Sequence, residues 1–264
     1  MAEKSSKVGA HPMPSGVELV ELRGEAIVPL VRAVAALAIA GLARYAIVGG
    51  VAVTARLGQA HRATADIDAV VDQSTPPDAV EALLRLPGAT ADPSAIHRVL
   101  VDGTKIEILG VEPLDDQDLQ GIPDKDALFV AAHAWALDTA TPLTLVASAV
   151  RATAPVASPA ALVAMKLHAI EDRSPSRGQD KRAGDAWDIY RLLLDRDARG
   201  EIRRDMGGAS PALRRLVAQA ADRVLVRGVA RTRSWLAAGD ASMASVTADE
   251  LRFVGERFVT SLAN

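Results

Sequence analysis

Two aspartates separated by one residue, Asp66 and Asp68, are the side chains whose type and spacing most directly point to chemistry. Alternate residues of a β-strand point to the same face, so a strand here would present both carboxylates on one side. Two carboxylates that close repel each other unless a cation lies between them. The pair therefore predicts a divalent-cation site, although an Asp-x-Asp on its own is more typical of a solvated turn.

A glycine pair, Gly49-Gly50, precedes these aspartates by sixteen residues. It follows the short β-branched run over residues 45–48 and comes before a helical pattern, so it predicts a strand-to-helix turn. Bare backbone N–H groups at such a turn can bind a phosphate. Arg62 and Thr64 lie between the glycines and the aspartates, and we expect them to contribute to the same phosphate site.

A third carboxylate, Glu107, belongs to another predicted strand. Its neighbours Ile106 and Ile108 are better suited to the core, which leaves Glu107 on the face that carries the aspartates. Asp66, Asp68 and Glu107 beside a glycine turn predict a Mg²⁺ site for phosphoryl transfer, with a nucleoside triphosphate (NTP) as the substrate.

The elements that must position these residues follow from the apolar periodicity and the turn residues. The pattern predicts an α/β N-terminal half followed by a helical C-terminal half. We divide the chain into a flexible tail (1–15), a mixed α/β domain (16–154) and a helical domain (155–264). The predicted elements are a helix over 17–43 kinked at Pro29, strands over 45–48 and 67–71, helices over 51–57 and 78–86, a hairpin over 97–109 turning at Asp102-Gly103, a short element over 129–137, a strand over 143–150, a helix from Pro159 capped by Ser158, and a helix over 183–195.

The composition is that of an ordinary globular protein. Of 264 residues, 49% are hydrophobic and 24% charged, which excludes disorder as the dominant state. The absence of cysteine excludes disulfides and thiolate metal sites. No apolar run reaches the length of a spanning helix and the first residues do not resemble a signal peptide, so we expect a cytoplasmic protein without a membrane partner.

The net charge of −3 is distributed unevenly along the chain. Residues 1–150 contain 11 Lys/Arg and 19 Asp/Glu, whereas residues 151–264 contain 19 and 14. The arginines of the second half could bind nucleic-acid phosphates, or they could pair with acids on a helical surface. The arginines and lysine concerned are Arg173, Arg177, Lys181, Arg182, Arg203, Arg204, Arg214, Arg215, Arg223, Arg227, Arg231 and Arg233.

Two blocks of this sequence resemble a known family. The first is Tyr45-Ala-Ile-Val-Gly-Gly-Val-Ala-Val with Arg62-x-Thr64-x-Asp66-Ile-Asp68, which looks like the DNA polymerase β-type nucleotidyltransferase fold. The second is Met165-Lys-Leu-His-Ala, Arg173 and Asp185-Ala-Trp-Asp188-Ile-Tyr190, which narrows the resemblance to the AbiEii toxin branch. Together the blocks cover about residues 40–195.

The resemblance implies a short mixed sheet flanked by helices, a helical C-terminal domain, Mg²⁺ and an NTP substrate. It also implies a toxin that transfers nucleotides to the 3′ end of tRNA and so blocks translation, with a cognate antitoxin as a possible partner. Asp66 and Asp68 would be the metal ligands, Lys166 would bind the triphosphate, and Asp185 and Asp188 would face the cleft.

Two positions depart from the family pattern. Gly184 stands where many members have a basic residue before the first aspartate of the second block, and Lys181 or Arg182 could replace that charge. The third carboxylate, Glu107, is a glutamate rather than an aspartate.

The residues themselves leave alternatives open. Lys166 could instead be a surface lysine, and Asp185 and Asp188 could form surface pairs with Arg182 or Arg191. We expect Trp187 and Tyr190 in the core and His61 at the surface. A protein or small-molecule acceptor, or a non-catalytic RNA- or antitoxin-binding role, remains an alternative to tRNA transfer.

Overall fold

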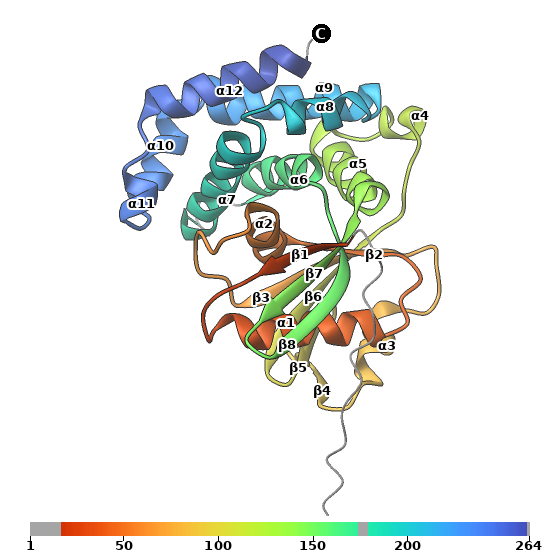
Figure 1. Ribbon diagram of the computed structural model, residues 1–264. Helices are drawn as coiled ribbons and strands as arrows, with labels where there is room; N and C mark the ends of the chain where they lie inside the picture. Colours follow the sequence, from red (N-terminus) through yellow and green to blue (C-terminus); the bar gives the residue numbers. More distant parts are fainter. Residues whose placement is uncertain (1–16, 174–178, 263–264) are drawn as a thin grey trace, which may run out of the picture.

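The computed structural model describes residues 17–173 and 179–262 (Figure 1). A twisted β-sheet occupies the lower part of this view, and the helices of the C-terminal part of the chain gather above it. Helix α2 (Gly49–Leu57) lies between the sheet and these helices. This arrangement confirms the predicted mixed α/β fold with a helical C-terminal region. The predicted tail over residues 1–15 lies outside the described residues.

Within the described residues, eight strands form one mixed sheet in the order β1-β7-β8-β2-β3-β6-β5-β4. The inner strand β3 runs antiparallel to β2 and parallel to β6. Strands β5 and β6 form the predicted hairpin, with positive φ at both Asp102 and Gly103 of its two-residue turn. The strands are β1 (Glu18–Glu21), β2 (Tyr45–Val48), β3 (Asp66–Asp72), β4 (Ala89–Ala91), β5 (Arg98–Val101), β6 (Thr104–Val111), β7 (Thr141–Ala147) and β8 (Val150–Val156).

The helices cover the sheet and then pack on one another. Helix α1 packs on β8 and β7, α2 on β3, and α5 on α6, which in turn packs on α7. None of the helices in the described part of the chain has both the length and the apolar character needed to cross a membrane. The helices are α1 (Ile27–Ile39), α2, α3 (Ala79–Leu84), α4 (Asp116–Leu119), α5 (Asp124–Thr139), α6 (Pro159–Asp172), α7 (Gln179–Arg191), the π-helical turn η1 (Leu192–Arg196), α8 (Glu201–Gly207), α9 (Pro211–Ala221), the π-helical turn η2 (Asp222–Val226), α10 (Val229–Ala237), α11 (Ala241–Ala244) and α12 (Ala248–Leu262).

The prediction of one helix over residues 17–43 is wrong in its first part. Residues Glu18–Glu21 form β1, which pairs in parallel with β7, more than 120 residues further along the chain. Helix α1 begins only at Ile27, so Pro29 falls in its first turn. Proline costs little there because the N–H groups of a first turn have no intrahelical partner, and the predicted break inside the helix is therefore not needed.

The single strand predicted over residues 143–150 is instead the antiparallel pair β7 and β8. Pro155 within β8 hid the second strand, because proline lacks the N–H that a sheet ladder requires. Strand β8 accommodates it since its pairing with β2 is confined to Val156 and Ile47. Strand β8 also crosses the boundary predicted between residues 154 and 155.

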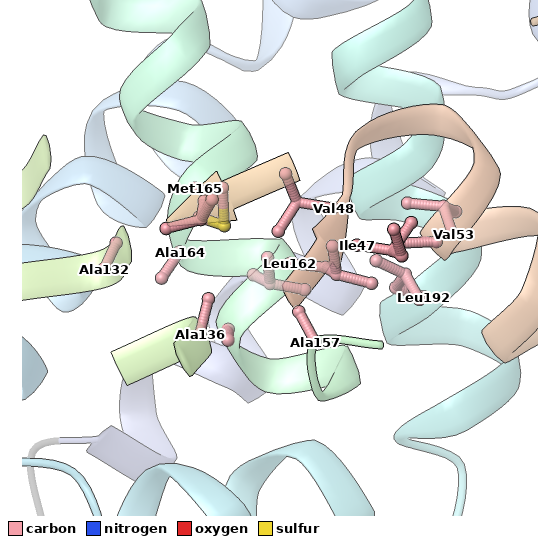
Figure 2. Packing of buried hydrophobic residues seen from close by; sticks show 14 of the residues in the cluster. Ile47, Val48, Val53, Ala132, Ala136, Ala157, Leu162, Ala164, Met165 and Leu192 are labelled. Atoms are coloured by element: carbon pink, nitrogen blue, oxygen red, sulfur yellow. The ribbon is translucent and has the colours of Figure 1, made fainter. Parts of the chain in front are cut away.

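The core beneath the site joins the sheet to the helical layer. Figure 2 shows Leu162 of α6 pointing toward Ile47 of β2 and Ala136 of α5. Ser158 caps the start of α6 by accepting a hydrogen bond from the Ala161 N–H, as its sequence predicts. This packing fixes α6 against β2, so the end of β2 and the middle of α6 are held close together.

Candidate active site

The three predicted carboxylates lie on adjacent strands and line one cavity. Strands β3 and β6 are parallel neighbours, and their register places Asp68 beside Glu107. Asp66, Asp68 and Glu107 border a cavity of about 480 Å³, a volume within the usual range for small-molecule sites. The cavity is also lined by residues of α5, α6 and α7, and by Gly49, Gly50, Arg62 and Thr64.

The glycine pair lies directly against these strands. Gly49 has a φ of +68°, and a Cβ at this position would lie 1.8 Å from Oδ2 of Asp68. A Cβ on Gly50 would lie 2.8 Å from Oγ1 of Thr64 and 3.0 Å from Nη2 of Arg62. At position 49 only glycine satisfies both the positive φ and the close approach of Asp68. The turn thus brings bare backbone at the start of α2 next to the residues that the sequence predicts to bind phosphate.

Asp68 is a carboxylate without a side-chain partner in the described part of the chain. Among the residues that the structure describes, the side chains of Asp66 and Asp68 make no hydrogen bond or ion pair. Burial, together with the negative charge of Asp66, raises the pKa of Asp68 to about 7. A cation at this place would offset both effects, so the donor set fits a hard divalent ion.

Glu107 differs from the two aspartates because it already has partners. Nη2 of Arg98 lies 2.9 Å from one carboxylate oxygen and Nε2 of His97 lies 3.5 Å from the other. Within residues 17–173 and 179–262, no group of three or more histidine, aspartate or glutamate side chains is arranged to hold a metal ion. The role of Glu107 as a third metal ligand therefore stays a prediction.

Lys166 is buried between two carboxylates of α7. Its Nζ lies 2.7 Å from Oδ1 of Asp185 and 3.0 Å from Oδ2 of Asp188. Burial disfavours the ammonium, but the charges of Asp185 and Asp188 outweigh that effect and raise the pKa of Lys166. The surface alternatives for these three residues are thus wrong. Lys166 and Asp185 line the cavity.

Asp188 is fully buried and does not line the cavity. His61 contacts it through Nε2 at 2.6 Å, and Arg62 binds both of its oxygens at 2.7 Å. Burial opposes its ionisation, but Lys166, Arg62 and His61 together lower the pKa of Asp188 well below its ordinary range. The expectation of a surface His61 is wrong, because its ring is enclosed against Asp188. Trp187 is buried as predicted, and its indole N–H donates to the His61 carbonyl.

Several basic side chains lie next to Asp185, where Gly184 replaces the basic residue found in many family members. Arg173 donates to Oδ2 of Asp185 through Nε and Nη2, at 3.0 and 2.6 Å. Arg182 is buried and donates to the backbone carbonyl of Arg173, whereas Lys181 is exposed and lines the cavity. The guanidinium of Arg62 lies over Gly184, where a Cβ would be 3.6 Å from Nε. Arg62 thus supplies a positive charge beside Gly184. Arg177 lies outside the described residues.

Another part of the cavity wall was not predicted as a binding surface from the sequence. Phe129 and His133 of α5 line it together with Met165 and His168 of α6. His133 and His168 do not have the spacing of metal ligands, and the sequence over residues 129–137 predicts only a short element of unspecified type. The spacing of Phe129 and His133 by four residues was the available signal, because it places both rings on one helix face.

Several arginines of the C-terminal half are paired with acids. Glu171 accepts two hydrogen bonds from Arg223, at 2.5 and 2.9 Å. Three further pairs join Arg203 to Asp197, Arg215 to Asp124 and Arg227 to Asp222. This part of the arginine pattern therefore matches the alternative of a paired helical surface.

Comparison with known protein families gives one match. A family model described as nucleotidyl transferase AbiEii toxin, Type IV TA (toxin–antitoxin) system, matches residues 33–233. The matched stretch is well over half of the chain and contains all of the site residues described above. No curated protein matches the chain.

Proposed function

Since this chain belongs to the AbiEii family of nucleotidyl transferase toxins of type IV toxin–antitoxin systems, we propose that it transfers a nucleoside monophosphate from an NTP to the 3′ end of tRNA. Such a transfer would block aminoacylation and hence translation. The observation that carries the proposal is the Asp66 and Asp68 pair beside the Gly49-Gly50 turn, in a cavity that Lys166 also lines. Neither aspartate has a partner among the residues that the structure describes. A toxin of this kind implies an antitoxin partner.

Asp66 and Asp68 would hold Mg²⁺. Glu107 would assist them once its carboxylate has released Arg98 and turned to the metal ion. Mg²⁺ is usually bound by one or two carboxylates together with substrate phosphates, which agrees with a site that offers two free carboxylates. The ion would neutralise triphosphate charge and lower the pKa of the attacking hydroxyl.

The chain's own residues would position the reactants. The backbone at Gly49 and Gly50, with Thr64 and Arg62 beside it, would bind phosphate oxygens. The 3′-hydroxyl oxygen of the acceptor would bond to the α-phosphorus as its proton is lost to water. The bond from the α-phosphorus to the oxygen that bridges it to the β-phosphate would break, and pyrophosphate would leave. Lys166 would stabilise the departing phosphates, with Asp185 and Asp188 keeping it charged and oriented.

The test is transfer of labelled nucleotide from each of the four NTPs to total tRNA in the presence of Mg²⁺. Wild-type protein should label tRNA, and Asp68→Ala should abolish labelling while remaining folded. Asp118→Ala, an exposed aspartate of α4, is the matched control and should retain activity. Full activity of a folded Asp68→Ala variant would exclude this mechanism.

The paired arginines of the C-terminal half favour one alternative acceptor, a protein side chain, since they leave less free positive charge for RNA. Labelling of a protein in a cell extract, with none on tRNA, would select that acceptor. NTP binding with no transfer to either would indicate a non-catalytic member that binds RNA or an antitoxin.

A further inference from the structure

Three rings form a compact wall on the cavity that contains Asp66 and Asp68. The ring centroids of Phe129 and His133 are 4.1 Å apart, and that of His168 lies 5.2 Å from Phe129. His133 and His168 meet edge to face at 6.2 Å. All three residues line the cavity, so this weakly polar aromatic surface, in which the rings are tilted to one another, is continuous with the carboxylate site.

The hydrogen bonds of His133 fix the chemical character of the wall. Its Nδ1 lies 2.6 Å from the backbone carbonyl of Phe129, which can only accept, so Nδ1 carries the proton. Burial lowers the pKa of His133 to about 4, and the ring is therefore neutral near pH 7. Nε2 is then a hydrogen-bond acceptor, and it has no partner within the described part of the chain.

The other residues of the wall are also without net charge near pH 7. Burial also lowers the pKa of His168. Asp172 at the cavity edge is paired with Lys125 at 2.8 Å, so it offers no free charge. A neutral aromatic surface with one free acceptor is suited to a planar group that stacks and donates a hydrogen bond.

Building on the proposed function, we propose that Phe129, His133 and His168 bind the base of the incoming NTP, and that Nε2 of His133 favours cytosine over uracil. The two pyrimidines stack alike, but cytosine presents a 4-amino donor where uracil presents a carbonyl oxygen. A hydrogen-bond acceptor that faces the 4-position binds the amino group of cytosine and repels the carbonyl oxygen of uracil. His133 is thus a specificity-determining residue rather than a catalytic one.

The experiment measures equilibrium binding of CTP and UTP to the full chain with Mg²⁺ and no tRNA. Wild-type protein should bind CTP about threefold to tenfold more tightly than UTP, the range of one neutral hydrogen bond. His133→Phe keeps a ring but removes the acceptor, and should bring the ratio close to one. Phe129→Leu should weaken both nucleotides about fivefold or more and keep the ratio. Phe253→Leu, an exposed aromatic on α12, is the matched control and should change neither affinity.

A substrate analogue tests the same contact without relying on a variant that has to fold. The ribonucleoside triphosphate of 2-pyrimidinone lacks the 4-amino group and should bind wild-type protein more weakly than CTP, because the hydrogen bond to Nε2 of His133 is lost. Equal affinities for CTP and UTP, or an unchanged ratio in a folded His133→Phe variant, would overturn the base site while leaving nucleotide transfer possible. A CTP preference lost in His133→Phe, in a protein that transfers nothing, would support the base site and reject the proposed function.

Discussion

At the scale of single residues, Gly49 is the position where backbone conformation and the site depend on each other. Its positive φ lets the chain turn from the end of β2 into the start of α2, and the absence of a side chain lets Asp68 approach the backbone. Gly58, at the other end of α2, has nearly the same φ of +71°, but a Cβ there would meet nothing within 4 Å. The two glycines therefore separate the cost of the backbone conformation from the cost of the contact.

Gly49→Ala should lower both stability and activity. We expect a loss of about 3 kcal/mol or more in unfolding free energy from strain and overlap, and transfer reduced about 100-fold because Asp68 is displaced. Gly58→Ala should cost about 1–2 kcal/mol and leave transfer nearly unchanged. Urea unfolding and the tRNA labelling assay measure the two effects. Equal activity of the two variants would show that the approach of Asp68 to the turn is not required.

His133 should make stability depend on pH. Its pKa is lowered from 6.5 to about 4 by burial, so the folded state disfavours its protonation. The stability that it contributes is present above about pH 6.5 and is lost as the pH falls toward 4, about 3 kcal/mol in total. Urea unfolding at pH 7 and at pH 4.5 should therefore show a steeper loss for wild type than for His133→Phe. Parallel losses in the two proteins would contradict a neutral, buried His133.

At the scale of elements, α6 and α7 are joined by a buried lysine held between two aspartates. The side chain of Lys166 is 11% exposed, whereas that of Lys125, which pairs with Asp172 at a similar distance, is 50% exposed. The same residue types thus form one enclosed and one solvated pair. Removing a partner costs far more in the first case, because a buried charge is left uncompensated.

Lys166→Met should destabilise the protein by about 3–5 kcal/mol in urea unfolding, with transfer lost as well. Lys125→Met is the matched control and should cost less than about 1 kcal/mol. A similar small effect of both substitutions would mean that solvent reaches the Lys166 pair.

The success of sequence-based prediction at this scale depended on how far apart the interacting residues are. The strand-to-helix turn at Gly49 and the carboxylate face of β3 follow from local spacing, and both were predicted. The pairing of His61 with Asp188 joins residues 127 positions apart, and no local pattern encodes it. Strand β1 was missed for the same reason, since its order comes from pairing with the distant β7.

At the scale of the whole molecule, positive charge without an acidic partner lies at the cavity as well as on the C-terminal helices, where Arg214 and Arg231 form no ion pair within the described residues. Lys181 is exposed at the cavity and makes no ion pair within the described residues. Arg227, by contrast, is paired with Asp222 at 2.5 Å. If the chain binds tRNA, we expect the phosphates near Lys181.

Lys181→Ala should weaken tRNA binding about tenfold and reduce the slope of log affinity against log salt by about one. Arg227→Ala, the matched control, should change the affinity less than about twofold. Filter binding at several salt concentrations measures both quantities. A larger loss in Arg227→Ala would place the nucleic acid on the C-terminal helices instead.

The contacts around Asp188 also determine which parts of this chain can be exchanged. His61 and Arg62 come from the acidic first half, and their common partner comes from the basic second half. The buried ion pair of Arg62 with Asp188 therefore requires both halves. A chimera that takes its C-terminal helices from a relative should fold only when the donor supplies an acid at position 188, or when residues 61 and 62 are transplanted with the helices. Recombination between members of the family is thus constrained at this buried contact.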